Sequence, residues 1–192
     1  QIFQYSHGKP LLYQAMDALL GYAQQKQKDF IAFLRTLVEF ESPSDDSAAT
    51  TRFAELLADS LTGIAKVKLH PGGKFGKHLR AEFTLPGRKK QGQILVLGHG
   101  DTVWPIGTLA TMPWREQDGR LYGPGIFDMK AGVAMFIQAM RGLRELDIPI
   151  GRKVVLQLNS DEEVGSPSSR VFTEKESRLS VAALLLEPSA GP

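Results

Sequence analysis

The chain has 192 residues, of which 42% are hydrophobic and 23% are charged, and its formal net charge is +2. This balance fits one globular domain with a substantial core. So small a net charge gives no sign of a nucleic-acid partner. The one short basic cluster, residues 88–90, stands beside turn-forming Pro and Gly, and this context favours a solvated loop.

Two absences from the sequence narrow the chemistry further. There is no cysteine, so disulfides and thiolate metal sites are excluded, and any metal must be held by His, Asp or Glu. No apolar run approaches the roughly 18 residues that span a bilayer. We therefore expect no membrane partner, while a cytoplasmic and a periplasmic location both stay open.

The N-terminal part of the chain predicts helices. Apolar residues recur at helical spacing from residue 11 to about residue 40, and Gly21 is a candidate break between two helices. A further helix is expected to follow, with Asp45 or Asp46 as its N-cap and Gly63 as its stop.

The rest of the chain alternates strand and helix patterns. Residues 67–69 and 79–85 alternate between apolar and polar side chains, which predicts half-exposed strands. Apolar runs predict three buried strands, at residues 94–97, 154–158 and 181–186. Residues 130–146 form a convincing amphipathic helix pattern. Such alternation predicts an α/β domain with a largely parallel sheet sandwiched by helices.

Each of the three predicted buried strands is followed by side chains that bind divalent metals. In chain order these are His99 and Asp101, then Asp161, Glu162 and Glu163, and finally Glu187. In an open α/β sheet, ligands bind at the carboxyl ends of the strands, so these side chains can surround one point. The sequence therefore predicts a metal site.

His99 and Asp101 make the sharpest local motif. Residues two apart in an extended segment project to the same side, so Asp101 can support His99 or share its site. A carboxylate that accepts the imidazole proton fixes the tautomer and makes the other ring nitrogen a better ligand. A plain polar turn in which His99 is merely hydrogen-bonded remains an open alternative.

Asp128 follows a glycine-containing turn at the start of the amphipathic helix, where a carboxylate can cap the helix or bind a metal. Capping alone is the commoner role. A dinucleotide site does not fit, because the Gly-x-Gly-x-x-Gly spacing fails at Asp128 and a carboxylate there would repel a pyrophosphate. The acids at residues 161–163 also have a simpler alternative, a solvated acidic loop.

Four ordered motifs carry a family resemblance. They are His-Gly-Asp-Thr-Val-Trp at residues 99–104, Gly-Pro-Gly-Ile-Phe-Asp-Met-Lys at 123–130, Asp-Glu-Glu-Val-Gly-Ser at 161–166 and Glu-Pro at 187–188. The chain resembles the zinc carboxypeptidase and deacylase family, which includes glutamate carboxypeptidase, acetylornithine deacetylase, succinyl-diaminopimelate desuccinylase and aminoacylase. The motif sequences are most similar to those of the bacterial glutamate carboxypeptidase branch.

This resemblance implies a pair of zinc ions, with cobalt or manganese as possible replacements, in a zinc exopeptidase-like (phosphorylase/hydrolase-like) catalytic domain. By position, Asp128 would bridge both metals, His99 and Glu187 would complete one shell, and Glu163 would bind the other ion. Glu162 would be the general base and Asp101 the partner of His99. The resemblance also implies a cis peptide bond between Asp128 and Met129.

The family pattern has parts that the sequence lacks. Family members carry a further metal-binding histidine near the C-terminus and a smaller inserted domain that supplies dimer contacts and substrate groups. We therefore expect residues 1–192 to be the N-terminal part of a catalytic domain whose complete form is a homodimer. The remaining histidines, His7, His70 and His78, match no ligand of the family.

The resulting expectation is a metallopeptidase that hydrolyses a peptide or N-acyl amino acid and releases a C-terminal amino acid, glutamate above others. The alternative within this class is an N-acyl amino acid deacylase, which differs in its substrate pocket and not in its metals. An alternative from another class is a non-catalytic metal-binding fragment.

Overall fold

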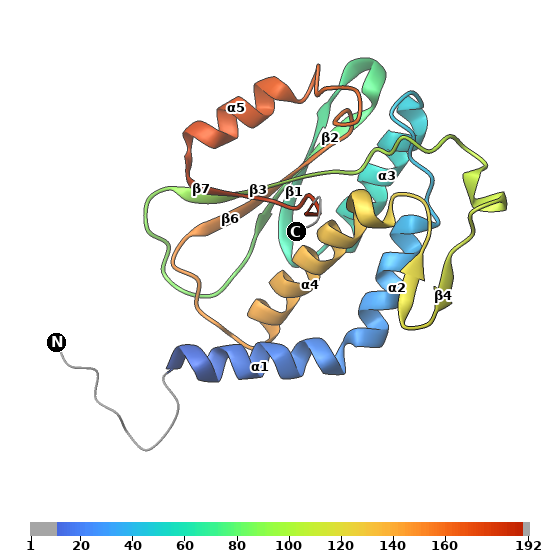
Figure 1. Ribbon diagram of the computed structural model, residues 1–192. Helices are drawn as coiled ribbons and strands as arrows, with labels where there is room; N and C mark the ends of the chain where they lie inside the picture. The colour runs from blue at the N-terminus through green and yellow to red at the C-terminus, as the bar shows by residue number, and fades with distance from the viewer. Residues whose placement is uncertain (1–10, 190–192) are drawn as a thin grey trace.

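A computed structural model describes residues 11–189 (Figure 1). His7 lies outside the described residues. The centre of the fold is a five-stranded sheet in the order β1-β2-β6-β3-β7. Its strands are β1 (Ala65–Pro71), β2 (Lys77–Phe83), β3 (Gln93–His99), β6 (Lys153–Asn159) and β7 (Ser180–Leu185). A separate small hairpin joins β4 (Arg115–Gln117) to β5 (Arg120–Tyr122).

The sheet is mixed. β6, β3 and β7 run parallel to one another, and these are the three strands that the apolar runs predict. β1 and β2 form an antiparallel hairpin, which joins the sheet through an antiparallel pairing of β2 with β6. The parallel part carries the carboxyl ends where the predicted metal-binding side chains follow.

Helices cover both faces of the sheet (Figure 1). They are α1 (Leu11–Gln25), α2 (Gln27–Val38), α3 (Ser47–Ser60), α4 (Ala131–Glu145) and α5 (Arg170–Arg178). α2, α3 and α4 pack on one face, and α5 lies on the other. Among the described residues, no helix is long and apolar enough to cross a membrane.

Alternation along the strands builds the main core. Leu79, Ala81 and Phe83 of β2 point to the helices of the larger layer, and Leu156 and Leu158 of β6 join them there. Between them, Arg80 and Glu82 are only partly buried, so the alternation that predicts a half-exposed strand at residues 79–85 is confirmed.

β7 departs from its prediction. Its apolar run predicts a buried strand, but Val181, Leu184 and Leu185 are 57%, 53% and 65% exposed. The reason is topological, because in the part of the chain that the structure describes β7 is an edge strand paired only with β3.

The helix boundaries also differ in detail from the predictions. Gly21 lies inside α1, and the break falls at Lys26, between α1 and α2. A helix tolerates one glycine at a cost of only about 1 kcal/mol, so Gly21 does not force a break. Asp46 caps α3 as predicted, since its side chain accepts hydrogen bonds from the amides of Ala48 and Ala49 at 3.0 and 2.9 Å.

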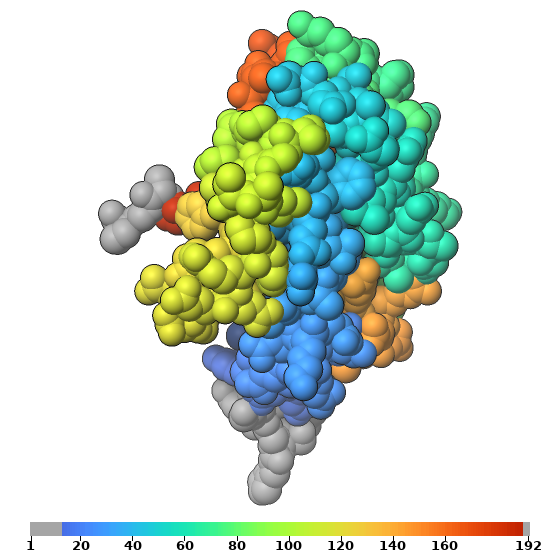
Figure 2. All heavy atoms as spheres, turned by 90° about the vertical axis from the view of Figure 1, so that its right-hand side faces the viewer, coloured from blue at the N-terminus to red at the C-terminus, as the bar shows by residue number. Residues whose placement is uncertain are grey.

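The segment after β3 lies on the surface beside the blue and cyan helices, where Figure 2 shows it in yellow-green and yellow. It contains the short turn η2 (Thr108–Ala110) and the β4–β5 hairpin. Glu41 holds it to the end of α2, because its carboxylate accepts hydrogen bonds from the amides of Gly107 and Leu109 at 2.7 and 2.9 Å. The chain then returns to the sheet at a kinked turn, η3 (Ile126–Lys130), in which Asp128 and Met129 have non-helical backbone angles, before α4 begins.

Candidate metal centre

The register of the parallel strands brings three chain segments to one place. His99, the last residue of β3, pairs with Asn159, the last residue of β6. On the other side Leu97 pairs with Leu185, and the Leu186 amide donates to the Leu97 carbonyl at 3.0 Å. The segments that follow β6 and β7 therefore leave the sheet next to His99.

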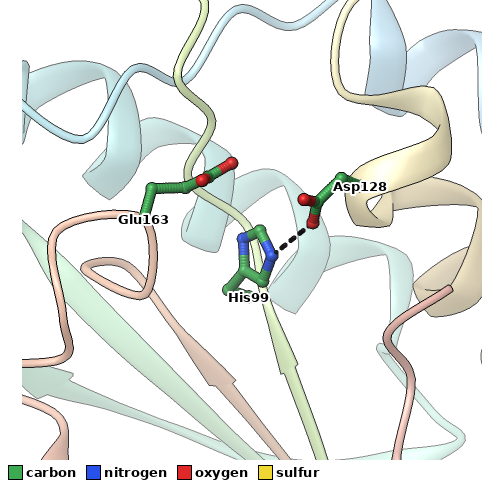
Figure 3. A group of neighbouring side chains, drawn as sticks. All are labelled: His99, Asp128 and Glu163. Carbon is green, nitrogen blue, oxygen red and sulfur yellow. Dashed lines mark hydrogen bonds and ion pairs between the residues drawn. The ribbon is translucent and has the colours of Figure 1, made fainter. Parts of the chain in front are cut away.

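The side chains that the sequence predicts as metal ligands converge around the imidazole of His99 (Figure 3). Nε2 of His99 lies 2.9 Å from Oδ1 of Asp128 and 3.5 Å from Oε1 of Glu187. Oε2 of Glu162 is 3.9 Å away. Two sets of side chains could each hold a metal ion, because the ligand atoms within each set lie within 4.8 Å of one another. One set is His99, Asp128 and Glu163, and the other is His99, Glu162 and Glu187.

His99 is fixed from its other nitrogen. The side chain is only 1% exposed, and Nδ1 lies 3.0 Å from the backbone carbonyl of Asp101, against 3.5 Å to the nearer carboxylate oxygen. A donor at Nδ1 leaves Nε2 free to act as a ligand on the side of Asp128. The support that the sequence predicts from Asp101 is thus present, but the backbone oxygen is the closer acceptor.

The carboxylate of Asp101 has another set of partners. Its two oxygens accept hydrogen bonds from the amides of Glu162 and Glu163, both at 3.2 Å, and Oδ2 also accepts one from the Ser44 hydroxyl at 2.7 Å. Ser44 reaches it because Pro43 forms a parallel bridge with Thr102. No local pattern in the sequence signals this contact, because the two residues lie 57 positions apart in the chain.

Asp128 comes to the site from η3. The structure shows no side-chain N-cap bond for α4, so Asp128 does not serve merely as a cap, and its carboxylate faces His99 instead. The peptide bond between Asp128 and Met129 is cis, as the resemblance predicts. The turn requires a glycine at residue 125, where φ is +66° and a Cβ would lie 2.6 Å from a Thr102 methyl carbon.

The electrostatics show an excess of negative charge. Burial and the nearby Asp128 carboxylate raise the pKa of Glu163. Burial also raises the pKa of Glu187, with Asp128 and Glu162 adding to the effect against the opposing influence of His99. Burial alone would lower the pKa of His99, but hydrogen bonds to Asp101 and Asp128 outweigh it and raise that pKa to about 9.

The nearest buried lysine does not relieve this charge. Lys130 is 2% exposed, donates to the Phe40 carbonyl at 2.8 Å and stands 4.7 Å from the centre of the Phe53 ring. Burial lowers its pKa to about 7. The donor set around His99, one imidazole with several crowded carboxylates, fits a divalent metal such as zinc, whose charge would offset the repulsion.

The comparisons with known proteins agree with this geometry. The model of peptidase family M20/M25/M40 matches residues 95–191. Carboxypeptidase G2 of Pseudomonas sp. (strain RS-16) is 29% identical over 186 residues, which is 95% of this chain and 44% of that protein. Acetylornithine deacetylase of Edwardsiella ictaluri is 28% identical over 84% of this chain and 43% of that protein.

Among solved structures, human carnosine dipeptidase 1 matches 88% of this chain with a TM-score of 0.76 at 22% identity, and the match covers 40% of its own chain. The chain thus spans less than half the length of these relatives. The family model matches half of the sequence, including most of β3, all of α4 and β6, and the predicted ligands His99, Asp128, Glu163 and Glu187. The chain therefore belongs to peptidase family M20/M25/M40.

Proposed function

We propose that this site binds a pair of zinc ions and serves the hydrolysis of an amide bond that releases a C-terminal amino acid. One observation carries the proposal. His99 and the carboxylates of Asp128, Glu163 and Glu187 converge at the carboxyl ends of three parallel strands, with the pKa values of both glutamates raised. Family membership supports metal-dependent hydrolysis as the chemistry.

In this proposal Asp128 would be a ligand shared by both metals, because its carboxylate faces His99 and raises the pKa values of Glu163 and Glu187. His99 and Glu187 would hold one ion, and Glu163 would hold the other. When bound, the zinc pair would polarise the scissile carbonyl and make a water more acidic. Asp101 orients His99 through its carbonyl and holds the amides of both loop glutamates.

Glu162 is assigned the proton transfers. Its side chain is 46% exposed, so it can meet a substrate and a water, whereas its amide is fixed by Asp101. As general base it would take the proton of the attacking water and deliver that proton to the leaving nitrogen. The ligand sets by themselves do not separate Glu162 from Glu163, because each belongs to one of them.

The substrate is the finer part of the proposal. Release of glutamate rests on the resemblance of the motifs to glutamate carboxypeptidase, and the similarity to carboxypeptidase G2 supports the release of a C-terminal residue. Acylated amino acids with other side chains are the second candidate, which the similarity to acetylornithine deacetylase favours.

A matched pair of isosteric variants tests these roles. In the complete enzyme with zinc present, Glu162→Gln should keep the metal and lose roughly 100- to 10,000-fold in hydrolysis rate, because it removes only the base. Glu163→Gln should instead weaken zinc binding. Calorimetry gives the zinc affinity, and assays with an N-acyl-glutamate and with N-acetylornithine give the rates and the preferred substrate.

The opposite pattern, in which Glu162→Gln releases zinc and Glu163→Gln does not, would exchange the two assignments. Zinc binding by the unmodified protein without hydrolysis of either substrate would favour the non-catalytic alternative. A protein that binds no zinc would refute the proposal.

A further inference from the structure

A buried histidine lies beneath the loop that carries Glu162 and Glu163, and the proposed function does not use it. His78 of β2 is 1% exposed, and both of its ring nitrogens have partners. Nδ1 lies 3.2 Å from the Ser160 amide nitrogen and 3.0 Å from the Ser160 hydroxyl, while Nε2 lies 2.9 Å from the Ser168 hydroxyl.

The backbone amide settles the direction of these hydrogen bonds. An amide can only donate, so Nδ1 must accept from Ser160, and the ring proton of a neutral imidazole then resides on Nε2. Nε2 in turn donates to the Ser168 hydroxyl, which donates to Oδ2 of Asp161 at 2.7 Å. Burial lowers the pKa of His78, which agrees with a neutral ring.

Asp161 closes the loop from the other end. Its Oδ2 accepts hydrogen bonds from the amides of Ser168 and Ser169 at 2.6 and 3.1 Å, in addition to the Ser168 hydroxyl. Asp161 is fully buried and immediately precedes Glu162. The first and last residues of the loop, 160–161 and 168–169, are therefore tied to each other and to His78.

The ring of His78 has little freedom to move. Phe172 of α5 packs against it with ring centres 5.7 Å apart. Phe172 also packs on His70, the cross-strand neighbour of His78, with ring centres 4.9 Å apart. On another side, a Cβ on Gly72 would lie 2.8 Å from Nε2. A side chain held this closely can transmit its position to the loop that it contacts.

We propose that His78 is a positioning residue for the Glu162–Glu163 pair, acting through Ser160, Ser168 and Asp161. The carboxylate of Asp101 accepts hydrogen bonds from the amides of the two glutamates, and the hydrogen bonds around His78 fix the two ends of the same loop. The expected effect of His78 on metal binding rests on the proposed function, because that effect requires Glu163 to be a ligand. The expected effect of His78 on the order of the loop does not depend on the proposed function.

The test compares His78→Leu with His70→Leu, a matched control on the paired strand that contacts the same Phe172. Hydrogen exchange followed by mass spectrometry should show amides of residues 160–169 exchanging at least about tenfold faster in His78→Leu. The zinc affinity should fall roughly 10-fold or more, as for other groups that orient a ligand. His70→Leu should change neither quantity.

Two further variants separate positioning from simple core packing. His78→Asn keeps an acceptor that the Ser160 amide can reach, so it should restore part of the protection at residues 160–161. Ser168→Ala leaves the ring in place and removes its link to Asp161, so it should loosen the loop even if His78→Leu does not fold.

Exchange in residues 160–169 that is unchanged in both His78→Leu and Ser168→Ala would overturn the proposal. So would faster exchange spread evenly over β1, β2 and the loop, since that pattern indicates only a weakened core. Failure of the unmodified protein to bind zinc would refute the proposed function but not this inference, because loop exchange is measured without metal.

Discussion

The two ends of strand β3 both meet carboxylates, yet they are compensated differently. At its start, Glu176 of α5 accepts hydrogen bonds from Arg80 at 2.9 Å and from Gln93 at 2.8 Å. At its end, Asp128, Glu163 and Glu187 gather around the single imidazole of His99. The first cluster contains its own cation, and the second has more acids than bases.

The pKa shifts follow this difference. Burial by itself would raise the pKa of Glu176, but hydrogen bonds from Arg80 and Gln93 outweigh it and leave that pKa below its ordinary value. The pKa values of Glu163 and Glu187 are raised. A buried carboxylate with its own partner therefore behaves as a structural ion pair, whereas crowded carboxylates without one indicate a place for an external cation.

The largest effect is expected from Asp128→Asn. This change removes the carboxylate nearest to His99, so zinc affinity should fall at least about 100-fold, beyond the 10- to 100-fold typical of outer-shell partners. Zinc at about 100 times its Kd should stabilise the unmodified protein by roughly 2.7 kcal/mol, and the variant should lose most of this gain at the same zinc concentration. Calorimetry and thermal unfolding with and without zinc measure both. Glu176→Gln, which should keep zinc affinity, is the control.

A smaller effect, on stability alone, is expected at the other end of β3. Glu176→Gln leaves Arg80 without its closest carboxylate partner, which should lower the free energy of unfolding by about 1–3 kcal/mol at neutral pH. Urea unfolding measures the loss. An equal loss of zinc affinity in this variant would show that the two clusters are not independent.

The same variant carries a pH dependence. Since the folded pKa of Glu176 lies below its ordinary value of 4.5, its contribution to stability is complete above pH 4.5 and disappears as the pH falls through the folded pKa. Stability curves of the unmodified protein and Glu176→Gln should therefore converge below pH 4.5. Curves that stay parallel there would contradict the ion-pair interpretation.

The smallest effect is expected for Glu174→Gln on the surface of α5. Glu174 pairs with Arg170 and Arg178 at helical spacing, and all three side chains are largely exposed. Surface pairs of this kind contribute little and are screened by salt. Thermal unfolding at physiological salt should not resolve the change. A clear loss of thermal stability would mean that side-chain exposure does not predict how much an ion pair stabilises this protein.

Much of the candidate site could be predicted from the sequence because its signal is local. An apolar run followed at once by His99, by Glu162 and Glu163, or by Glu187 reports a strand and its carboxyl end within a few residues. Family motifs then join these pieces, and the structure brings the same side chains together. Which glutamate binds metal and which moves protons stays a prediction.

The burial of strands and the pairing of distant residues were harder to predict from the sequence. The exposure of β7 follows from its place at the edge of the sheet, and strand order is set by contacts between residues far apart in the chain. The same holds for the contact of Ser44 with Asp101, across 57 positions, and of His78 with Ser168, across 90.

The sequence by itself determined which elements form and which chemistry follows them, because helix and strand periodicity and the choice of metal-binding side chains are properties of neighbouring residues. The tertiary structure decided which side chains meet and which charges are left uncompensated. The physical reason is that a buried carboxylate is stabilised or destabilised by whatever the fold packs against it. Glu176 meets Arg80 there, and Glu163 meets Asp128.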